Sequence, residues 1–297
     1  MDTSRQRDSE SGERRSPNRS VLRPVTEHGE TGLPRWAERR TTTRRPPRVD
    51  TVSLVIPTMN EARNLATVLD HVPDAVSEVI LVDRSSDVTE TMATSCIPDV
   101  RIIEEPLPGK GNALRAGFAA AQGDIIVAMD ADGSMSPSEI PNLLYLLEHG
   151  FDFVKGSRFI VGGGSLDITP LRRAGNRGLV ILANHLYRTQ LTDLCYGFFA
   201  FRRQYLDQLD LRSTGFEIET EITARAVLVG LRVTEAPSME LPRRSGVSNL
   251  HTFKDGMRVL RALIHEKERA KREPGGTMKA GRGGGGSQDL EAHGAAS

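Results

Sequence analysis

The chain contains 297 residues, of which 38% are apolar and 26% are charged, and its 39 Lys and Arg balance 39 Asp and Glu. A zero net charge gives no case for a nucleic-acid partner, and two cysteines cannot build a disulfide framework. Because no segment approaches the roughly 18–20 apolar residues of a transmembrane helix, we expect a cytoplasmic globular protein.

The two ends of the chain differ in composition from its middle. Residues 1–49 contain 12 Arg, no Lys and 7 acidic residues, a net charge of +5 (12 − 7), and almost no apolar periodicity. This composition predicts a disordered basic arm, either solvated or in contact with acidic lipid head groups. Residues 273–297, which include the glycine-rich run 281–287, predict a disordered tail. The folded domain is therefore expected to span residues 50–272.

The middle of the chain alternates apolar strands with helices. The first expected elements are a strand at 52–56, a helix that opens at 60–64 with Asn60 as its N-cap, and a strand at 78–83. A helix at 89–95, a strand at 100–103, a helix at 111–121 and a strand from 123 onward follow. Strands and helices that alternate at this spacing predict right-handed βαβ units and a mostly parallel, Rossmann-like sheet flanked by helices.

Two carboxylates, Asp130 and Asp132, stand one residue apart at the end of the last of these strands. Side chains alternate along a strand, so both carboxylates are expected to point the same way. Two negative charges at such a short distance repel each other unless a cation lies between them. A hard divalent ion binds carboxylate oxygens and keeps coordination positions open for phosphates. The alternative is a solvated turn with two unrelated aspartates.

Other polar segments are expected at the same edge of the sheet, because ligands of parallel sheets lie at the carboxyl ends of the strands. The segment 57–61 follows the first strand, and Asp83 ends the second, where it either accepts hydrogen bonds from a nucleoside or caps the next helix. Lys110 lies in a glycine-flanked loop at a helix start, from which it can reach a phosphate or simply point to solvent. The sequence therefore predicts a crevice for a phosphorylated ligand.

These segments together resemble family 2 glycosyltransferases of the GT-A fold. The resemblance is carried by IPTMNE at 56–61, GKG at 109–111, MDADG at 129–133 and GSRF at 156–159. RAGN at 173–176, TDLCYGF at 192–198 and GFEIE at 215–219 are similar to the polyprenyl-phosphate sugar transferases, the dolichol-phosphate mannose and glucose synthase branch. The resemblance covers about residues 52–265.

The resemblance implies an inverting transfer of a hexose from a nucleotide-diphosphate sugar, of the UDP-glucose or GDP-mannose class. Asp130 and Asp132 would meet a divalent cation, Mg²⁺ or Mn²⁺, and Arg158 would lie on the phosphate side of the site. The stretch 83–89 lacks the glycines that the family usually has there, which leaves the donor's base unassigned. Five side chains are expected to bind the nucleotide: Pro57, Asn60, Glu61, Asp83 and Lys110.

The acceptor is left open by the residues alone. A polyprenyl phosphate arrives ionised and needs only positioning, whereas a hydroxyl acceptor needs a general base, for which Asp193 and Glu217 are candidates unless they cap a helix or pair with arginines. The segments after Asn176 favour the lipid phosphate; the alternatives are a soluble hydroxyl acceptor or a non-catalytic sugar-nucleotide-binding module. A lipid acceptor implies peripheral contact with the inner face of the membrane. The basic amphipathic helix at 253–267 either supplies that contact or packs on the domain.

Overall fold

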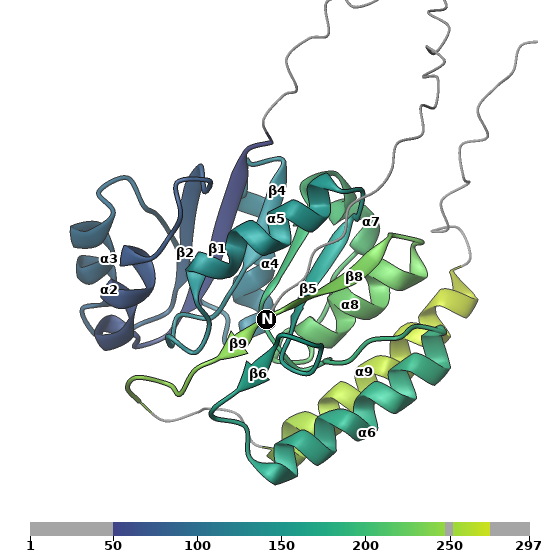
Figure 1. The fold of residues 1–297 in the computed structure, drawn as a ribbon. Helices are drawn as coiled ribbons and strands as arrows, with labels where there is room; N and C mark the ends of the chain where they lie inside the picture. The colour runs from purple at the N-terminus through teal and green to yellow at the C-terminus, as the bar shows by residue number, and fades with distance from the viewer. Residues whose placement is uncertain (1–49, 247–251, 274–297) are drawn as a thin grey trace, which may run out of the picture. The chain divides into compact units, whose positions relative to one another are not determined.

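The computed structural model describes residues 50–246 and 252–273 (Figure 1). The basic arm and the Gly-rich tail expected from the sequence lie outside the described residues, apart from Glu273.

A seven-stranded sheet forms the centre of the domain, in the order β3-β2-β1-β4-β7-β5-β8 (Figure 1). All neighbouring strands are parallel except β7, which runs antiparallel to both β4 and β5. The mostly parallel sheet expected from the sequence is therefore confirmed. The strands are β1 (Val52–Thr58), β2 (Glu78–Asp83), β3 (Arg101–Glu104), β4 (Ile125–Ala128), β5 (Phe153–Ser157), β7 (Phe199–Arg202) and β8 (Val233–Pro237).

Helices cover both faces of this sheet. Leu54 and Ile56 of β1 pack with α2 and α5 on one face, whereas Val55 packs with α4 and α8 on the other. Strands buried on both faces are continuous apolar runs, which explains why β1 and β2 are evident in the sequence. The helices of the described residues are α2 (Ala62–Asp70), α3 (Thr89–Cys96), α4 (Lys110–Ala120), α5 (Ile140–Glu148), α6 (Pro170–Tyr187), α7 (Leu206–Leu209), α8 (Ile218–Leu228) and α9 (Thr252–Arg272), with short 3₁₀ turns η1 (Pro137–Glu139) and η2 (Arg203–Tyr205).

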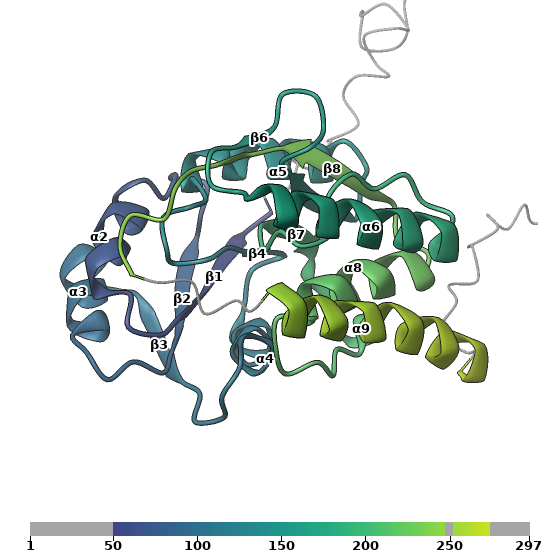
Figure 2. The same cartoon turned by 90° about the horizontal axis from the view of Figure 1, so that it is seen from below.

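Two further features lie beside the sheet. Strands β6 (Gly164–Ser165) and β9 (Met239–Glu240) pair in parallel as a separate two-stranded sheet. Helices α6 and α9 lie side by side and run in the same direction (Figure 2), and a third apolar cluster joins them to α8. Val180 and Ala183 of α6 meet Val259 and Leu263 of α9 in that cluster.

The start of α2 differs from the expectation, because Asn60 is not its N-cap. The N-cap position belongs to Glu61, and Asn60 takes a left-handed backbone conformation with φ of 61°. Its side-chain oxygen accepts a hydrogen bond from the backbone N–H of Ser86 at 2.9 Å, and its own N–H donates to Ser85 Oγ at 2.7 Å. Asparagine tolerates this conformation well, so Asn60 joins the loops that follow β1 and β2.

The helix expected at 253–267 corresponds to α9. It packs on the domain, but not through all of the expected apolar positions. Met257 and Ile264 are nearly half exposed, at 47% and 46%, whereas the neighbouring stripe with Val259 and Leu263 is buried. Phe253 lies in a part of α9 whose side chains the structure does not describe. Within the described ranges, none of the helices combines the length and the apolarity that a bilayer crossing requires.

Candidate functional site

A cleft of about 420 Å³ lies at the carboxyl ends of the parallel strands. Of the residues predicted from the sequence, six line it: Pro57, Glu61, Lys110, Asp130, Asp132 and Arg158. Four do not, although the structure describes all of them: Asn60, Asp83, Asp193 and Glu217. The cleft continues from this charged end to the N-terminal halves of α6 and α9, where Leu179 and Val259 are among its lining residues.

The first charged cluster of the cleft is centred on Lys110, the first residue of α4. Its Nζ lies 2.5 Å from Asp130 Oδ1 and 2.5 Å from Glu219 Oε1. Burial by itself would lower the pKa of Lys110, but the charges of Asp130 and then Glu219 outweigh it and raise that pKa, so the ammonium is a fixed positive charge. Burial also raises the pKa of Asp130 although Lys110 opposes the shift. Lys110 therefore compensates a carboxylate that has been partly removed from water.

A second cluster joins Asp132 to Arg243. Arg243 Nη2 lies 2.8 Å from Asp132 Oδ2, and its Nη1 lies 3.2 Å from Glu61 Oε1. The other oxygen of Asp132 accepts a hydrogen bond from the backbone N–H of Ser134 at 2.9 Å. Arg243 was not predicted from the sequence, although the pair Arg243-Arg244 in a segment rich in Pro, Ser and Gly was a visible signal. Each aspartate of the pair thus contacts its own cationic side chain.

The donor set of this cleft fits a divalent cation that shares its ligands with a substrate. Strand β4 ends at Ala128, so Asp130 and Asp132 lie in the loop beyond it and both line the cleft. Among the described residues, no group of three or more His, Cys, Asp or Glu side chains is arranged to hold a metal. Two carboxylates that line one cleft are typical of Mg²⁺ or Mn²⁺ sites, which take part of their ligands from substrate phosphates and water.

Asp83 organises the loop after β2 rather than facing the cleft. It is only 4% exposed and accepts hydrogen bonds from Thr58 Oγ1 at 2.5 Å, from Ser85 Oγ at 2.7 Å and from the Ser85 backbone N–H at 3.0 Å. At the start of α3, the backbone N–H of Thr89 donates a hydrogen bond to the carboxylate of Asp87 and not to Asp83. Asp83 therefore fixes the ends of β1 and β2 relative to each other.

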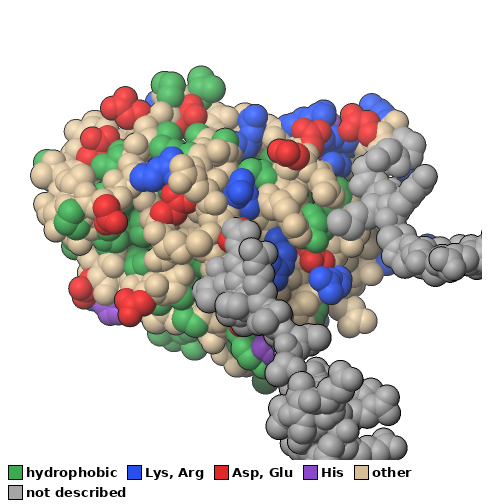
Figure 3. All heavy atoms as spheres, turned by 90° about the horizontal axis from the view of Figure 1, so that it is seen from above, with side chains coloured by type: hydrophobic (Ala, Val, Ile, Leu, Met, Phe, Trp, Pro, Cys, Tyr) green, Lys and Arg blue, Asp and Glu red, His purple; other side chains and the backbone are tan. Residues whose placement is uncertain are grey.

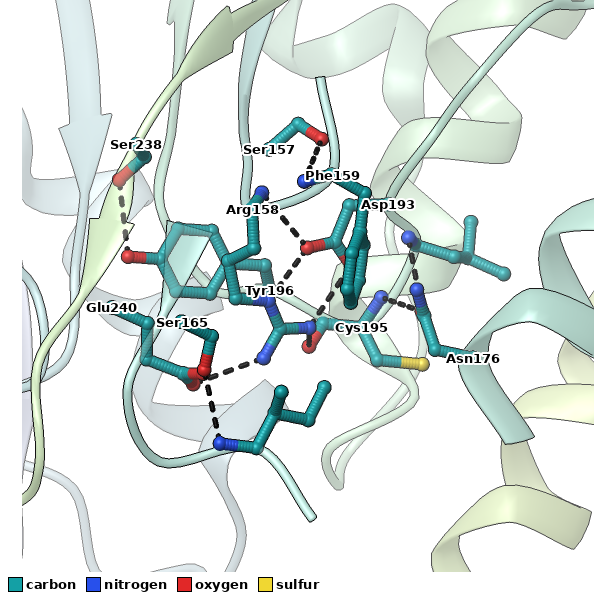
Figure 4. A network of polar contacts seen from close by, with 12 residues as sticks. Ser157, Arg158, Phe159, Ser165, Asn176, Asp193, Cys195, Tyr196, Ser238 and Glu240 are labelled. Carbon is teal, nitrogen blue, oxygen red and sulfur yellow. Dashed lines mark hydrogen bonds and ion pairs between the residues drawn. The ribbon is translucent and has the colours of Figure 1, made fainter. Parts of the chain in front are cut away.

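Arg158 forms the centre of a buried polar network (Figure 4). Its Nε and Nη2 donate to Asp193 at 2.6 and 3.0 Å, its Nη1 donates to Glu240 at 2.9 Å, and Nη2 also reaches the Cys195 carbonyl at 2.9 Å. The guanidinium carbon lies 4.7 Å from the centre of the Tyr196 ring. Such a bidentate pair is rigid, so Arg158 braces the segment 193–196 as a wall of the cleft.

The two candidate general bases lie away from the cleft. Asp193 is fully buried and held by Arg158. Glu217 accepts the Gly215 N–H through Oε1 at 3.1 Å, while its Oε2 is buried with no hydrogen-bond partner among the described atoms. Several carboxylates that line the cleft were not predicted from the sequence: Glu105, Asp167, Glu219, Glu240 and Asp255. Of these, Glu219 lies two residues after Glu217, on α8, and pairs with Lys110.

Lys155 of β5 fixes the same wall from behind. It is fully buried, and its Nζ donates to the Tyr196 carbonyl at 2.5 Å. Burial lowers the pKa of Lys155 despite the nearby charges of Glu219 and Asp193. Gly197, next along the chain, lies so close to the Lys110 cluster that a Cβ there would stand 2.6 Å from Lys110 Nζ and 2.7 Å from Glu219 Oε1.

Comparison with known proteins gives one family match and several relatives. The model of the family described as "Glycosyl transferase family 2" matches residues 53–210. A dolichyl-phosphate hexose transferase of Haloferax volcanii is 29% identical over 72% of this chain and 93% of its own length. An undecaprenyl-phosphate mannosyltransferase of Micrococcus luteus is 32% identical over 67% and 87%. A polyprenol monophosphomannose synthase of Mycolicibacterium smegmatis is 33% identical over 66% and 80%.

Solved structures share the fold. Glucosyl-3-phosphoglycerate synthase from Mycobacterium tuberculosis, in complex with Mn²⁺, UDP and glucosyl-3-phosphoglycerate, superimposes with a TM-score of 0.58. The two chains are 22% identical, and the match covers 74% of this chain and 80% of the other. At this identity the similarity is one of fold.

Proposed function

Because this chain belongs to glycosyl transferase family 2 and is a glycosyltransferase, we propose that it moves a hexose from a nucleotide-diphosphate sugar to a polyprenyl phosphate, with inversion at the anomeric carbon. The donor is of the UDP-glucose or GDP-mannose class, and the reaction requires Mg²⁺ or Mn²⁺. The observation that carries this proposal is the pair Asp130 and Asp132, two cleft carboxylates that are each matched by a cationic side chain.

The donor half of the proposal follows from charge. A nucleoside diphosphate brings negative charge into a cleft that already holds several carboxylates, so binding needs more positive charge than Lys110 supplies. Asp130 and Asp132 would hold the divalent cation, which when bound stabilises the charge on the departing nucleoside diphosphate. Arg243 would then leave Asp132 and become available to pair with a phosphate group. Solved glucosyl-3-phosphoglycerate synthase complexes that contain UDP with Mn²⁺ or with Mg²⁺ support this choice of ion.

The acceptor half rests on the positions of the candidate bases. Asp193 is committed to Arg158, and Glu217 lies outside the cleft. An acceptor that arrives already ionised needs no proton removed, so it is compatible with this arrangement. In the transfer, an acceptor phosphate oxygen forms a bond to the anomeric carbon from one side, while the bond to the nucleoside diphosphate breaks on the other. Relatives named as polyprenyl-phosphate transferases support this acceptor.

In this mechanism the residues of the chain position charge rather than exchange protons. Lys110 holds the Asp130 carboxylate in the cleft, and Glu219 prevents the ammonium from moving away. Arg158, with Asp193 and Lys155, keeps the wall at Tyr196 in place next to the reacting groups. Preorganised charges of this kind lower the barrier because they do not need to reorient as the leaving group becomes more negative.

The test of the donor half is a binding and turnover experiment on the wild type and on Asp132→Ala. UDP or GDP should raise the melting temperature together with Mg²⁺ or Mn²⁺, and neither component alone should do so. Asp132→Ala should abolish both this shift and transfer, while Asp70→Ala, an exposed carboxylate on α2, serves as the matched control. Full activity in EDTA would contradict the proposal.

The acceptor half is tested by Glu217→Gln, which keeps the oxygen that accepts the Gly215 N–H. Transfer should stay within a few-fold of the wild type, because no base is required. A hydroxyl-directed enzyme that used Glu217 would lose about 10²–10⁴-fold. Asp193→Asn is the poorer probe, since it weakens the buried pair with Arg158 and the fold with it.

A further inference from the structure

Helix α6 presents an exposed apolar stripe that the domain does not cover. Its inner face, with Val180 and Ala183, packs in the cluster with α8 and α9. On the outer face, Leu171 is 59% exposed and Ile181 is 62% exposed, and the small residues Ala174 and Gly178 lie between them at helical spacing. Exposed apolar side chains that recur on one helix face indicate a contact with something other than water.

Two more exposed apolar side chains lie in the segment between β5 and α6. Leu166, just before the helix, is 69% exposed, and Val161 in the turn after β5 is 96% exposed. That turn is attached to α6, because the Arg173 guanidinium lies 5.4 Å from the centre of the Phe159 ring. We call these six residues the α6 surface: Val161, Leu166, Leu171, Ala174, Gly178 and Ile181.

The charges carried by α6 itself have one sign. Helix α6 contains three arginines and His185 but no acidic residue, and Arg173 and Arg177 are exposed along one edge of the stripe. The nearest acid along the chain is Asp167, which follows Leu166, is exposed and also lines the cleft. By contrast, the side of the molecule opposite to the view in Figure 2 mixes acidic and basic side chains (Figure 3), as a solvated surface does. An apolar stripe with basic edges matches the head-group region of an anionic bilayer.

Helix α6 also contributes to the cleft. The opposite edge of α6, through Arg172, Gly175 and Leu179, lines the cleft together with Gly256 and Val259 of α9. This arm of the cleft combines small and apolar residues with the polar side chains of Asp167, Arg172, Asn176 and Asp255. The same cleft extends to the charged end at Asp130 and Asp132. A membrane in contact with α6 would therefore lie beside this arm of the cleft.

We propose that the α6 surface binds the surface of an anionic lipid bilayer, with Val161, Leu166, Leu171 and Ile181 among the acyl chains and Arg173 and Arg177 at the phosphates. This inference deepens the proposed function and rests on it for its purpose, since it explains how a polyprenyl phosphate reaches the cleft. The long arginine side chains can extend to the head groups while the helix lies in the interface.

The first test measures binding of the full chain to vesicles without substrates. Wild type should bind vesicles of phosphatidylcholine with phosphatidylglycerol better than vesicles of phosphatidylcholine alone. The double substitution Leu171→Glu and Ile181→Glu should weaken binding at least about tenfold, and Arg177→Glu should weaken it at least about fivefold. Val88→Glu and Arg63→Glu are matched controls at exposed positions on the α3 and α2 side of the domain, and they should bind as the wild type does. Unchanged binding of the double variant would overturn the proposal.

A second measurement detects insertion directly. Trp36 is the only tryptophan of the chain, so Ile181→Trp in a Trp36→Phe background reports on α6 alone. Its emission should shift to the blue on vesicles and be quenched by brominated lipid, whereas Val88→Trp should show neither effect. A reporter at position 181 that stays solvent-exposed would overturn the proposal.

The failure of this inference can be told from the failure of the proposed function. Transfer to a short-chain polyprenyl phosphate free in solution should be equal in the wild type and in the Leu171→Glu, Ile181→Glu variant, because neither residue lines the cleft. Equal transfer together with equal vesicle binding would refute the membrane-binding role of the α6 surface but not the polyprenyl phosphate acceptor. Weakened vesicle binding of the variant, with no transfer to any lipid phosphate by either protein, would refute the acceptor but support the membrane-binding role of the α6 surface.

Discussion

At the scale of single residues, the carboxylates Asp130, Asp132, Glu61 and Glu219 of the cleft are each paired with a cationic side chain. Lys110 pairs with Asp130 and Glu219, and Arg243 pairs with Asp132 and Glu61. A third cation, Arg158, pairs with Asp193. Arg158 and Lys110 are nearly buried, whereas the Arg243 side chain is 23% exposed and belongs to a loop. Arg243 is therefore the cation that can exchange partners most easily when a charged substrate enters.

This difference predicts the effect of removing Arg243. Arg243→Ala should lower transfer by about 100-fold, the cost of losing one positive charge beside a developing anion, and should weaken nucleoside diphosphate binding. Arg244→Ala is the matched control, since Arg244 donates to Thr67 on α2 and does not line the cleft. Steady-state kinetics of both variants test this prediction. Equal losses of transfer activity in the two variants would mean that the loop conformation, and not the charge of Arg243, supports transfer.

The two cysteines are predicted to differ in reactivity. Burial, followed by the charges of Glu219 and Asp193, raises the pKa of Cys195 to about 12. A raised thiol pKa means that the thiolate is present only at high pH, so at pH 8 about one molecule in ten thousand carries it. Iodoacetamide should modify native protein once, at the exposed Cys96, and unfolded protein twice. Native Cys96→Ser should stay unlabelled until the pH approaches 12, and fast labelling of it at pH 8 would show that Cys195 is ionised.

At the scale of elements, the glycines around Lys110 serve packing. A Cβ on Gly111 would stand 2.3 Å from the Ser213 carbonyl oxygen, and one on Gly109, whose φ is +116°, would stand 2.1 Å from that of Thr214. The Gly111 N–H donates to the Thr214 carbonyl at 2.9 Å. The start of α4 and the segment before α8 are thus pressed together backbone to backbone, which brings Lys110 next to Glu219. Lys110 was expected to reach a phosphate or to point to solvent, whereas in the structure it pairs with Asp130 and Glu219.

A substitution pair measures this contact. Gly111→Ala should destabilise the fold by about 1–3 kcal/mol, because backbone atoms must move to admit the methyl group. Gly178→Ala in α6 should instead stabilise it by up to about 1 kcal/mol, since nothing lies within 4 Å of the added Cβ and alanine favours the helix. Urea unfolding gives both values. Equal effects of the two changes would mean that Gly111 is not packed as described.

Elements also differ in how far the sequence predicts them. The strands β1 and β2 are buried on both faces and appear as unbroken apolar runs, so their bounds are close to the expected ones. The buried face of α9 differs from the expected apolar stripe, because the helix buries charged residues such as Glu266 and Arg269 along with Val259 and Leu263. Arg269 contacts Glu266 and Asp210, and such a tertiary pairing has no periodic signature in the sequence.

At the scale of the whole molecule, the doubly covered sheet brings the ends of β1, β2, β4 and β5 to one edge, and this rule was sufficient to predict the crevice. It placed Glu61, Lys110, Asp130 and Asp132 on a common cleft before any contact was known. It could not place Arg243 or Glu219, because both arrive from distant segments after β9 and within α8. Nor could it separate residues that face the cleft from those that support it, such as Asp83 and Asp193, since burial depends on neighbours from other elements.

The polyprenyl phosphate acceptor proposed for this family 2 glycosyltransferase can be tested directly. The direct measurement gives the purified full chain radiolabelled UDP-glucose, GDP-mannose or UDP-N-acetylglucosamine with Mg²⁺ or Mn²⁺, each with and without a short-chain polyprenyl phosphate. One donor should send label into the organic phase, only when the polyprenyl phosphate is present, and Asp132→Ala should reduce that label to background. Label that stays in the aqueous phase on a new sugar conjugate, with organic counts at background for all three donors, would contradict it.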